Sequence, residues 1–127
     1  MRLTLLKSKL HRLTVTEAEL AYEGSFTLDE DLMDLAGLVH HERVELYDVT
    51  NGNRIATYVI PGPRGSRGAC ATGAAAHQIH EGDVVILATY AEFDAAEARS
   101  HEPTVLLMGP GNEVREMRRE RAGTASC

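Results

Sequence analysis

The chain has 127 residues and a mass of 13.9 kDa, so its length predicts one compact domain. Hydrophobic residues make up 43% and charged residues 25%, as in ordinary soluble globular proteins, and the net charge of −6 argues against nucleic-acid or anionic-membrane partners. The longest apolar run, residues 84–88, is far shorter than the ~20 residues that cross a bilayer, and Lys7 and Lys9 interrupt any N-terminal signal sequence. We therefore expect a cytoplasmic protein, and its two cysteines, Cys70 and Cys127, provide no disulfide framework.

Short segments of β-type composition follow one another along most of the chain. Strands are predicted over residues 3–6, 13–16, 43–49, 54–60, 69–72, 83–90 and 104–108. Asn51-Gly52 lies between two of these runs and predicts a tight hairpin turn in which both residues take positive φ. Six or seven short strands with Gly- and Pro-rich turns favour a mainly β fold, a small closed β-barrel without exposed sheet edges.

Helical signals are few. Residues 29–36 predict one short helix, because Asp29 suits the N-cap, an apolar stripe follows, and Gly37 ends it. Residues 94–100 predict a second helical turn. From Glu113 onward the chain mixes charges with no apolar face, which predicts a disordered tail over residues 113–127, outside a single domain of residues 1–112.

A Gly-Ser pair at residues 24 and 25 follows the second predicted strand. Such a pair usually forms a turn. In a strained peptide, however, the Ser25 hydroxyl could attack the carbonyl of Gly24, since glycine tolerates unusual backbone geometry and leaves its carbonyl open. The resulting ester could eliminate across Ser25 and, after hydrolysis, leave a pyruvoyl ketone at a new N-terminus.

Several further motifs accompany this pair in a fixed order. They are KLHR at 9–12, YEGS at 22–25, VTNGNR and IATY within 49–58, RGSR at 64–67, GAAAH at 73–77 and GDVVILATY at 82–90. Together, from about residue 1 to 103, they resemble the bacterial aspartate 1-decarboxylase family. The resemblance implies a six-stranded double-psi β-barrel that assembles as a homotetramer with active sites between subunits. It also implies a proenzyme that cleaves itself between Gly24 and Ser25 into a β chain of residues 1–24 and an α chain of residues 25–127, in some bacteria with a maturation factor.

The activity implied by this resemblance is the decarboxylation of L-aspartate to β-alanine and CO₂, which supplies β-alanine for pantothenate and coenzyme A. Ser25 would become the pyruvoyl group, which forms a Schiff base with the substrate and acts as the electron sink that pyridoxal phosphate provides elsewhere. No pyridoxal phosphate and no metal are expected, and neither His40-His41 nor the His77 and His80 pair has companions at metal-ligand spacing.

The resemblance also assigns roles to single residues. Tyr58 is the proton donor, and Arg54 has the planar guanidinium that suits a carboxylate. The full set implied for substrate binding is Thr57, Arg54, Lys9, Gly73, Ala74 and Ala75. The set implied for processing is Gly24, Ser25, Thr57 and Thr72. Thr57 would stabilise the oxyanion formed on Gly24, and Thr72 stands where the family usually has Asn.

Strand geometry raises one difficulty for this assignment. In a regular strand Arg54 and Tyr58 share one face while Thr57 lies on the other, so a strong twist or a neighbouring subunit must complete the site. Two alternatives stay open: an uncleaved, non-catalytic barrel that serves as a binding module, and a related pyruvoyl decarboxylase that acts on glutamate. One methylene changes discrimination by only ~1–3 kcal/mol.

Overall fold

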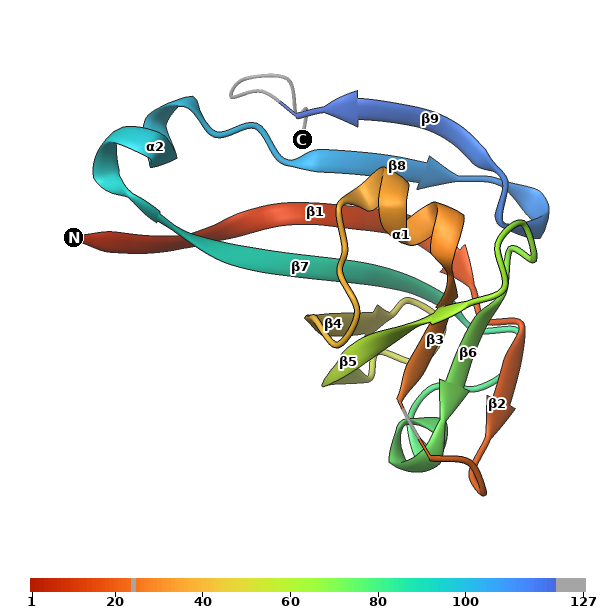
Figure 1. The fold of residues 1–127 in the computed structure, drawn as a ribbon. Helices are drawn as coiled ribbons and strands as arrows, with labels where there is room; N and C mark the ends of the chain where they lie inside the picture. The colour runs from red at the N-terminus through yellow and green to blue at the C-terminus, as the bar shows by residue number, and fades with distance from the viewer. Residues whose placement is uncertain (24, 121–127) are drawn as a thin grey trace.

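The computed structural model describes residues 1–23 and 25–120 (Figure 1). Its strands are β1 (Arg2–Thr14), β2 (Glu17–Glu19), β3 (Phe26–Asp29), β4 (Arg43–Asp48), β5 (Arg54–Gly62), β6 (Ala69–Thr72), β7 (Val84–Asp94), β8 (Thr104–Met108) and β9 (Val114–Arg119). Its helices are α1 (Glu30–Ala36) and α2 (Ala95–Ser100), with two 3₁₀ turns, η1 (Gly73–His77) and η2 (Pro110–Asn112). The predicted mainly β protein with two short helices is confirmed.

The strands form one mixed sheet in the order β2-β6-β3-β5-β4-β7-β1-β8-β9. In Figure 1 the long strands β1, β7, β8 and β9 run side by side, while β2, β3 and β6 form a second group. After β1 the chain bonds to distant strands: the Val15 N–H donates to the Asp83 carbonyl and the Thr16 N–H to the Ala69 carbonyl, both at 2.8 Å. These bonds bring the end of β1 to β6 and curl the sheet around its core.

The strand count differs from the predicted six. Nine strands are present among the described residues, and the strand pairs there leave β2 and β9 at the two ends of the order. The closed six-stranded double-psi form therefore stays a prediction. The predicted strand 3–6 and the first half of the predicted strand 13–16 lie in the single strand β1, which ends at Thr14. The polar residues between them are accommodated: Ser8 is buried and its hydroxyl bonds the Thr89 hydroxyl at 2.7 Å.

The core lies inside the curled sheet and beneath α1. Its fully buried side chains include Leu10, Leu13, Phe26, Leu28, Val44, Leu46, Val59, Val85, Leu87 and Leu106. Burial of each such side chain contributes roughly 1.5–3 kcal/mol. α1 adds Leu32 and Met33 to this core, and it is capped as predicted by Asp29, whose side chain accepts the Asp31 N–H at 2.8 Å. None of the helices in the described residues is long and apolar enough to cross a membrane.

The predicted β4–β5 hairpin is confirmed, but its turn differs from the prediction. Asp48 and Asn53 close the loop through an Asp48 N–H to Asn53 carbonyl bond of 2.8 Å, which leaves residues 49–52 between them. Only Gly52 takes positive φ, at 82°. Asn51 does not, because the Asp48 carboxylate accepts the N–H groups of Thr50 and Asn51 and holds a wider loop.

Residues at the C-terminal end also depart from the prediction. The expected disorder from residue 113 is wrong for β9, which pairs antiparallel with β8. β9 has no apolar face, and main-chain hydrogen bonds to β8 hold it in place. Its side-chain pattern therefore did not indicate a strand. The last part of the predicted tail, residues 121–127, lies outside the described residues.

Candidate active site

An open pocket of about 320 Å³ surrounds Ser25. The other residues that line it are Ile55, Ala56 and Thr57 of β5 and, on the opposite wall, Ala74, Ala75 and Gln78. Of the predicted site residues, the fold thus brings Ser25, Thr57, Ala74 and Ala75 together. The pocket also contains Gln78, which the sequence analysis did not select, because nothing in its type or its place after GAAAH indicates a pocket.

Three neighbouring strands determine where Ser25 lies. Phe26, the next residue, pairs with Val59 of β5 on one side and with Ala71 of β6 on the other. Extending these pairs by one residue places Ser25 beside Tyr58 and Thr72. The Ser25 carbonyl accepts the Thr72 N–H at 2.8 Å, which fixes the serine at the start of β3. Gly24, the other half of the predicted cleavage site, lies outside the described residues.

The wall opposite β5 is built on small residues. Thr72 is extended and Gly73 has φ of 64°, so the chain turns sharply from β6 into η1. A residue with a Cβ is strained at this φ, which explains the glycine. Ala75 then accepts the N–H groups of Gln78 and Ile79 at 3.1 and 3.0 Å, and Ile79 is fully buried. Methyl side chains at 74 and 75 leave the space next to Ser25 open.

Thr72 is the most unusual polar residue near the pocket. Its side chain is only 7% exposed, and its hydroxyl oxygen has no hydrogen-bond partner within the described residues. An unsatisfied buried polar group costs about 1–3 kcal/mol. Its backbone N–H bonds the Ser25 carbonyl, so Thr72 lies directly beside the predicted cleavage site.

The two faces of β5 separate the remaining predicted residues, as the sequence analysis anticipated. Ile55 and Thr57 are half-buried and line the pocket, whereas Arg54 and Tyr58 are exposed, as is Ala56, which lies between them and also lines the pocket. Neither Arg54 nor Tyr58 lines the Ser25 pocket. The Tyr58 ring, 40% exposed, contacts His41 with 6.0 Å between ring centroids.

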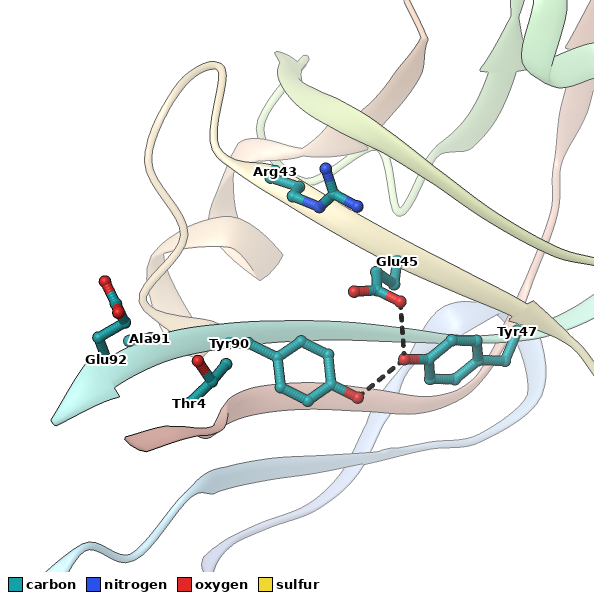
Figure 2. Close-up of a pocket in the computed structure, with 7 residues that line it drawn as sticks. All are labelled: Thr4, Arg43, Glu45, Tyr47, Tyr90, Ala91 and Glu92. Atoms are coloured by element: carbon teal, nitrogen blue, oxygen red, sulfur yellow. Dashed lines mark hydrogen bonds between the residues drawn. The ribbon is translucent and has the colours of Figure 1, made fainter. Parts of the chain in front are cut away.

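Arg54 lies over an aromatic residue of the facing strand. Its guanidinium carbon is 4.1 Å from the centroid of the Tyr47 ring, with which it is paired across the hairpin. Figure 2 shows the Tyr47 hydroxyl between two partners: it donates to Glu45 Oε1 at 3.1 Å and bonds the Tyr90 hydroxyl at 2.8 Å. Burial, reinforced by these hydrogen bonds, raises the pKa of Tyr47, so the phenol stays protonated.

This tyrosine cluster borders a second pocket, of about 490 Å³, which the sequence analysis missed. It is lined by Thr4, Arg43, Glu45, Tyr47, Tyr90, Ala91 and Glu92 (Figure 2). The pairing of Tyr47 with Arg54 across the predicted hairpin was the sequence feature that could have indicated this second pocket. Arg54, which is predicted to bind carboxylate, and Ser25, the predicted pyruvoyl residue, therefore lie at different pockets of one chain.

Lys9 likewise does not line the Ser25 pocket. It is half-buried on β1, where it pairs with Ala88 and Val105, and it makes no hydrogen bond or ion pair within the described residues. Its neighbour Lys7 instead bonds Glu42 at 2.6 Å. His11 lies two residues from Lys9, and burial together with the Lys9 charge lowers the pKa of His11. The described residues contain no group of three or more His, Cys, Asp or Glu side chains placed to hold a metal ion.

Comparison with known proteins agrees with the motifs. Residues 1–115 match the family described as aspartate decarboxylase. An aspartate 1-decarboxylase of Heliobacterium modesticaldum is 53% identical over 118 residues, which cover 92% of this chain and 89% of that protein. The aspartate 1-decarboxylases of Hyphomonas neptunium and Phenylobacterium zucineum are 50% and 48% identical, over 91% of this chain and 98% of each relative.

A serine pocket in a small β-sheet protein with these relatives defines a class of enzyme, the carboxy-lyases. Within that class, the chain belongs to the aspartate decarboxylase family. The resemblance predicted from the motifs is thereby confirmed, and it extends further along the chain than residue 103.

Proposed function

We propose that this protein decarboxylates L-aspartate to β-alanine and CO₂, with a pyruvoyl group made from its own Ser25 by cleavage of the Gly24–Ser25 bond. The β-alanine would serve pantothenate and coenzyme A synthesis. Family membership supports the reaction. The observation that supports the role of Ser25 is its place in a pocket beside Thr57, with its carbonyl held by the Thr72 N–H.

The residues around Ser25 fit a pyruvoyl group. That group supplies a ketone that condenses with the substrate amino group and accepts the electrons released as CO₂ leaves. The methyl side chains of Ala74 and Ala75 leave room for a substrate there. The Thr57 hydroxyl in the pocket and the Thr72 hydroxyl, which has no partner within the described residues, would provide hydrogen-bond donors for the oxygen atoms that gain charge during self-cleavage.

Tyr58 is the residue that we assign to proton donation. Extending the β3–β5 register by one residue puts Tyr58 beside Ser25, and its phenol is exposed. Donation of that proton to the α-carbon completes the conversion to β-alanine.

Arg54 and Lys9 bind substrate carboxylate in this proposal, but from a second copy of the chain. Neither lines the Ser25 pocket of its own chain, and Arg54 lies on an exposed face with Tyr47. A homotetramer with active sites between subunits would bring the Arg54 face of one copy to the Ser25 pocket of another. A maturation factor is a further partner, required if cleavage is slow in the isolated chain.

Intact-mass spectrometry under denaturing conditions tests the proposal. We expect two fragments, residues 1–24 and 25–127, the larger being lighter by one ammonia than a chain that begins with serine. Incubation with aspartate should release CO₂ and β-alanine, and borohydride should trap aspartate covalently on the larger fragment. The Ser25→Ala variant should stay one inactive chain. Cleavage or activity in that variant would overturn the proposal, and faster turnover of glutamate than of aspartate would overturn the choice of substrate.

A further inference from the structure

Two asparagines of the β4–β5 loop connect the two walls of the Ser25 pocket. The Asn53 side-chain amide donates to the Gln78 carbonyl at 2.9 Å, and the Asn51 amide donates to the same oxygen at 3.3 Å. Gln78 lines the pocket at the end of η1, and β5 begins immediately after Asn53. Each amide is thus a bridge from the β5 wall to the η1 wall.

The position of this bridge gives it influence over the pocket. Asn53 precedes Ile55 by two residues, and Ile55 is the first residue of the β5 wall. On the other wall, the Gln78 N–H donates to the Ala75 carbonyl, so Gln78 and Ala75 move together. The distance between the Asn53 amide and the Gln78 carbonyl therefore limits how far Ala75 can lie from β5.

The amides are themselves held in place. The Asn51 side-chain oxygen accepts the Asn53 N–H at 2.8 Å, and the Asn51 N–H donates to Asp48 at 3.2 Å. The Asn51 amide also donates to Asp83 at 3.4 Å, and the same Asp83 oxygen accepts the His80 N–H at 3.0 Å. Asp48 and Asp83 are both buried, so these contacts fix the amides before any ligand binds.

We propose that Asn53, supported by Asn51, is a positioning residue that sets the separation of the β5 and η1 walls and thereby the fit of substrate beside Ser25. This inference rests on the proposed function for its kinetic consequences. Neither asparagine lines the pocket, so both act through Gln78 and contact no reacting atom.

Asn53 is the better residue to test, because its side chain has one hydrogen bond in the described part of the chain, the bond to Gln78. The bonds that close the hairpin use the Asn53 main chain and are left intact by a side-chain change. Asn53→Asp keeps the shape but loses the donor, and Asn53→Ala removes the side chain without adding charge. Glu81→Gln is the matched control, since Glu81 is exposed near η1 and makes no hydrogen bond within the described residues.

Steady-state kinetics with aspartate give the first measurement. We expect both Asn53 variants to raise KM about threefold to tenfold with a smaller change in kcat, as loss of one positioning hydrogen bond implies, while Glu81→Gln matches the wild type. Lowering the pH should bring the KM of Asn53→Asp closer to that of the wild type, since a protonated carboxyl can again donate to Gln78. The ratio of the KM of Asn53→Ala to that of the wild type should not change with pH. KM values within twofold of the wild type for both variants would overturn the inference.

Amide hydrogen exchange gives a second measurement that does not depend on activity. Residues 73–79 should exchange several-fold faster in Asn53→Ala than in the wild type or in Glu81→Gln, with the rest of the sheet unchanged. Unchanged exchange there would overturn the inference by itself. A wild-type protein that neither cleaves nor decarboxylates would refute the proposed function instead, and the exchange rates would still decide whether Asn53 holds the η1 wall.

Discussion

The two faces of β5 differ in what surrounds them within one chain. On the Thr57 side, β3, η1 and Gln78 complete a pocket around Ser25, and the hairpin amides connect its walls. On the Arg54 side, the contacts within the described residues join Arg54 to the Tyr47 ring and Tyr58 to His41. One chain therefore builds the serine pocket but leaves Arg54, the cation proposed to bind aspartate, on an exposed face. In the proposed function a second copy joins the two faces, and this division can be tested residue by residue.

The largest expected effect is that of Tyr58→Phe, which changes the exposed face alone. Loss of the proton donor should lower kcat by about 10²–10⁴-fold. Cleavage between Gly24 and Ser25 should be unchanged, because the Thr57 side of the strand remains intact. Turnover and the masses of the fragments measure the two steps separately. If cleavage fails along with turnover, Tyr58 acts on processing and the two faces do not have separate tasks.

Arg54→Ala should have the next largest effect, on KM. A charged hydrogen bond is worth about 1.5–3 kcal/mol, so we expect KM for aspartate to rise about tenfold to a hundredfold with normal self-cleavage. Arg54→Lys should recover only part of this loss, since a lysine cannot form the paired bonds of a guanidinium.

Mixing two defective chains shows whether Arg54 serves its own pocket or a neighbour's. Ser25→Ala supplies an intact Arg54 face, and Arg54→Ala supplies an intact Ser25 pocket. Co-expressed in equal amounts, they should regain activity at up to about one quarter of the sites if the chains assemble at random and each site combines two copies. No recovery in mixed assemblies would show that each chain completes its own site.

Much of this organisation could be predicted from sequence, and what could not has physical reasons. The helix after Asp29 and the hairpin at Asn51-Gly52 follow from capping and turn residues, which act locally. β9 carries no apolar face, since main-chain bonds to β8 hold it. The motifs predicted that Ser25, Thr57, Ala74 and Ala75 share one site. Gln78 could not be predicted, because it lines the pocket as a result of the backbone path of η1. The wider hairpin loop was likewise unpredictable, because it depends on the Asp48 carboxylate accepting two N–H groups.

The smallest expected effect concerns the carboxyl pair beneath that loop. Asp48 is 3% exposed, and its Oδ2 has no hydrogen-bond partner within the described residues. Burial, with the hydrogen bond to Asp83, raises the pKa of Asp48 to about 6. Burial alone would raise the pKa of Asp83 as well, but the bonds from Asp48 and His80 lower it below its ordinary value. Below about pH 6 Asp48 therefore keeps its proton and donates it to Asp83, whose carboxylate also lies 3.5 Å from the His80 ring.

Asp48→Asn tests this pair through the pH dependence of stability. Since Asp48 binds its proton more tightly in the folded state than in the unfolded state, stability should fall as the pH rises from about 4 through about 6 and then level off. An asparagine can accept the Thr50 and Asn51 N–H groups and donate permanently to Asp83. We expect the variant to melt a few degrees higher than the wild type at pH 7.5 and close to it at pH 5. Thermal denaturation at both pH values measures this, with Glu81→Gln as the control. An equal shift at both pH values would show that the proton on Asp48 has no part in holding the loop that supports the Ser25 pocket.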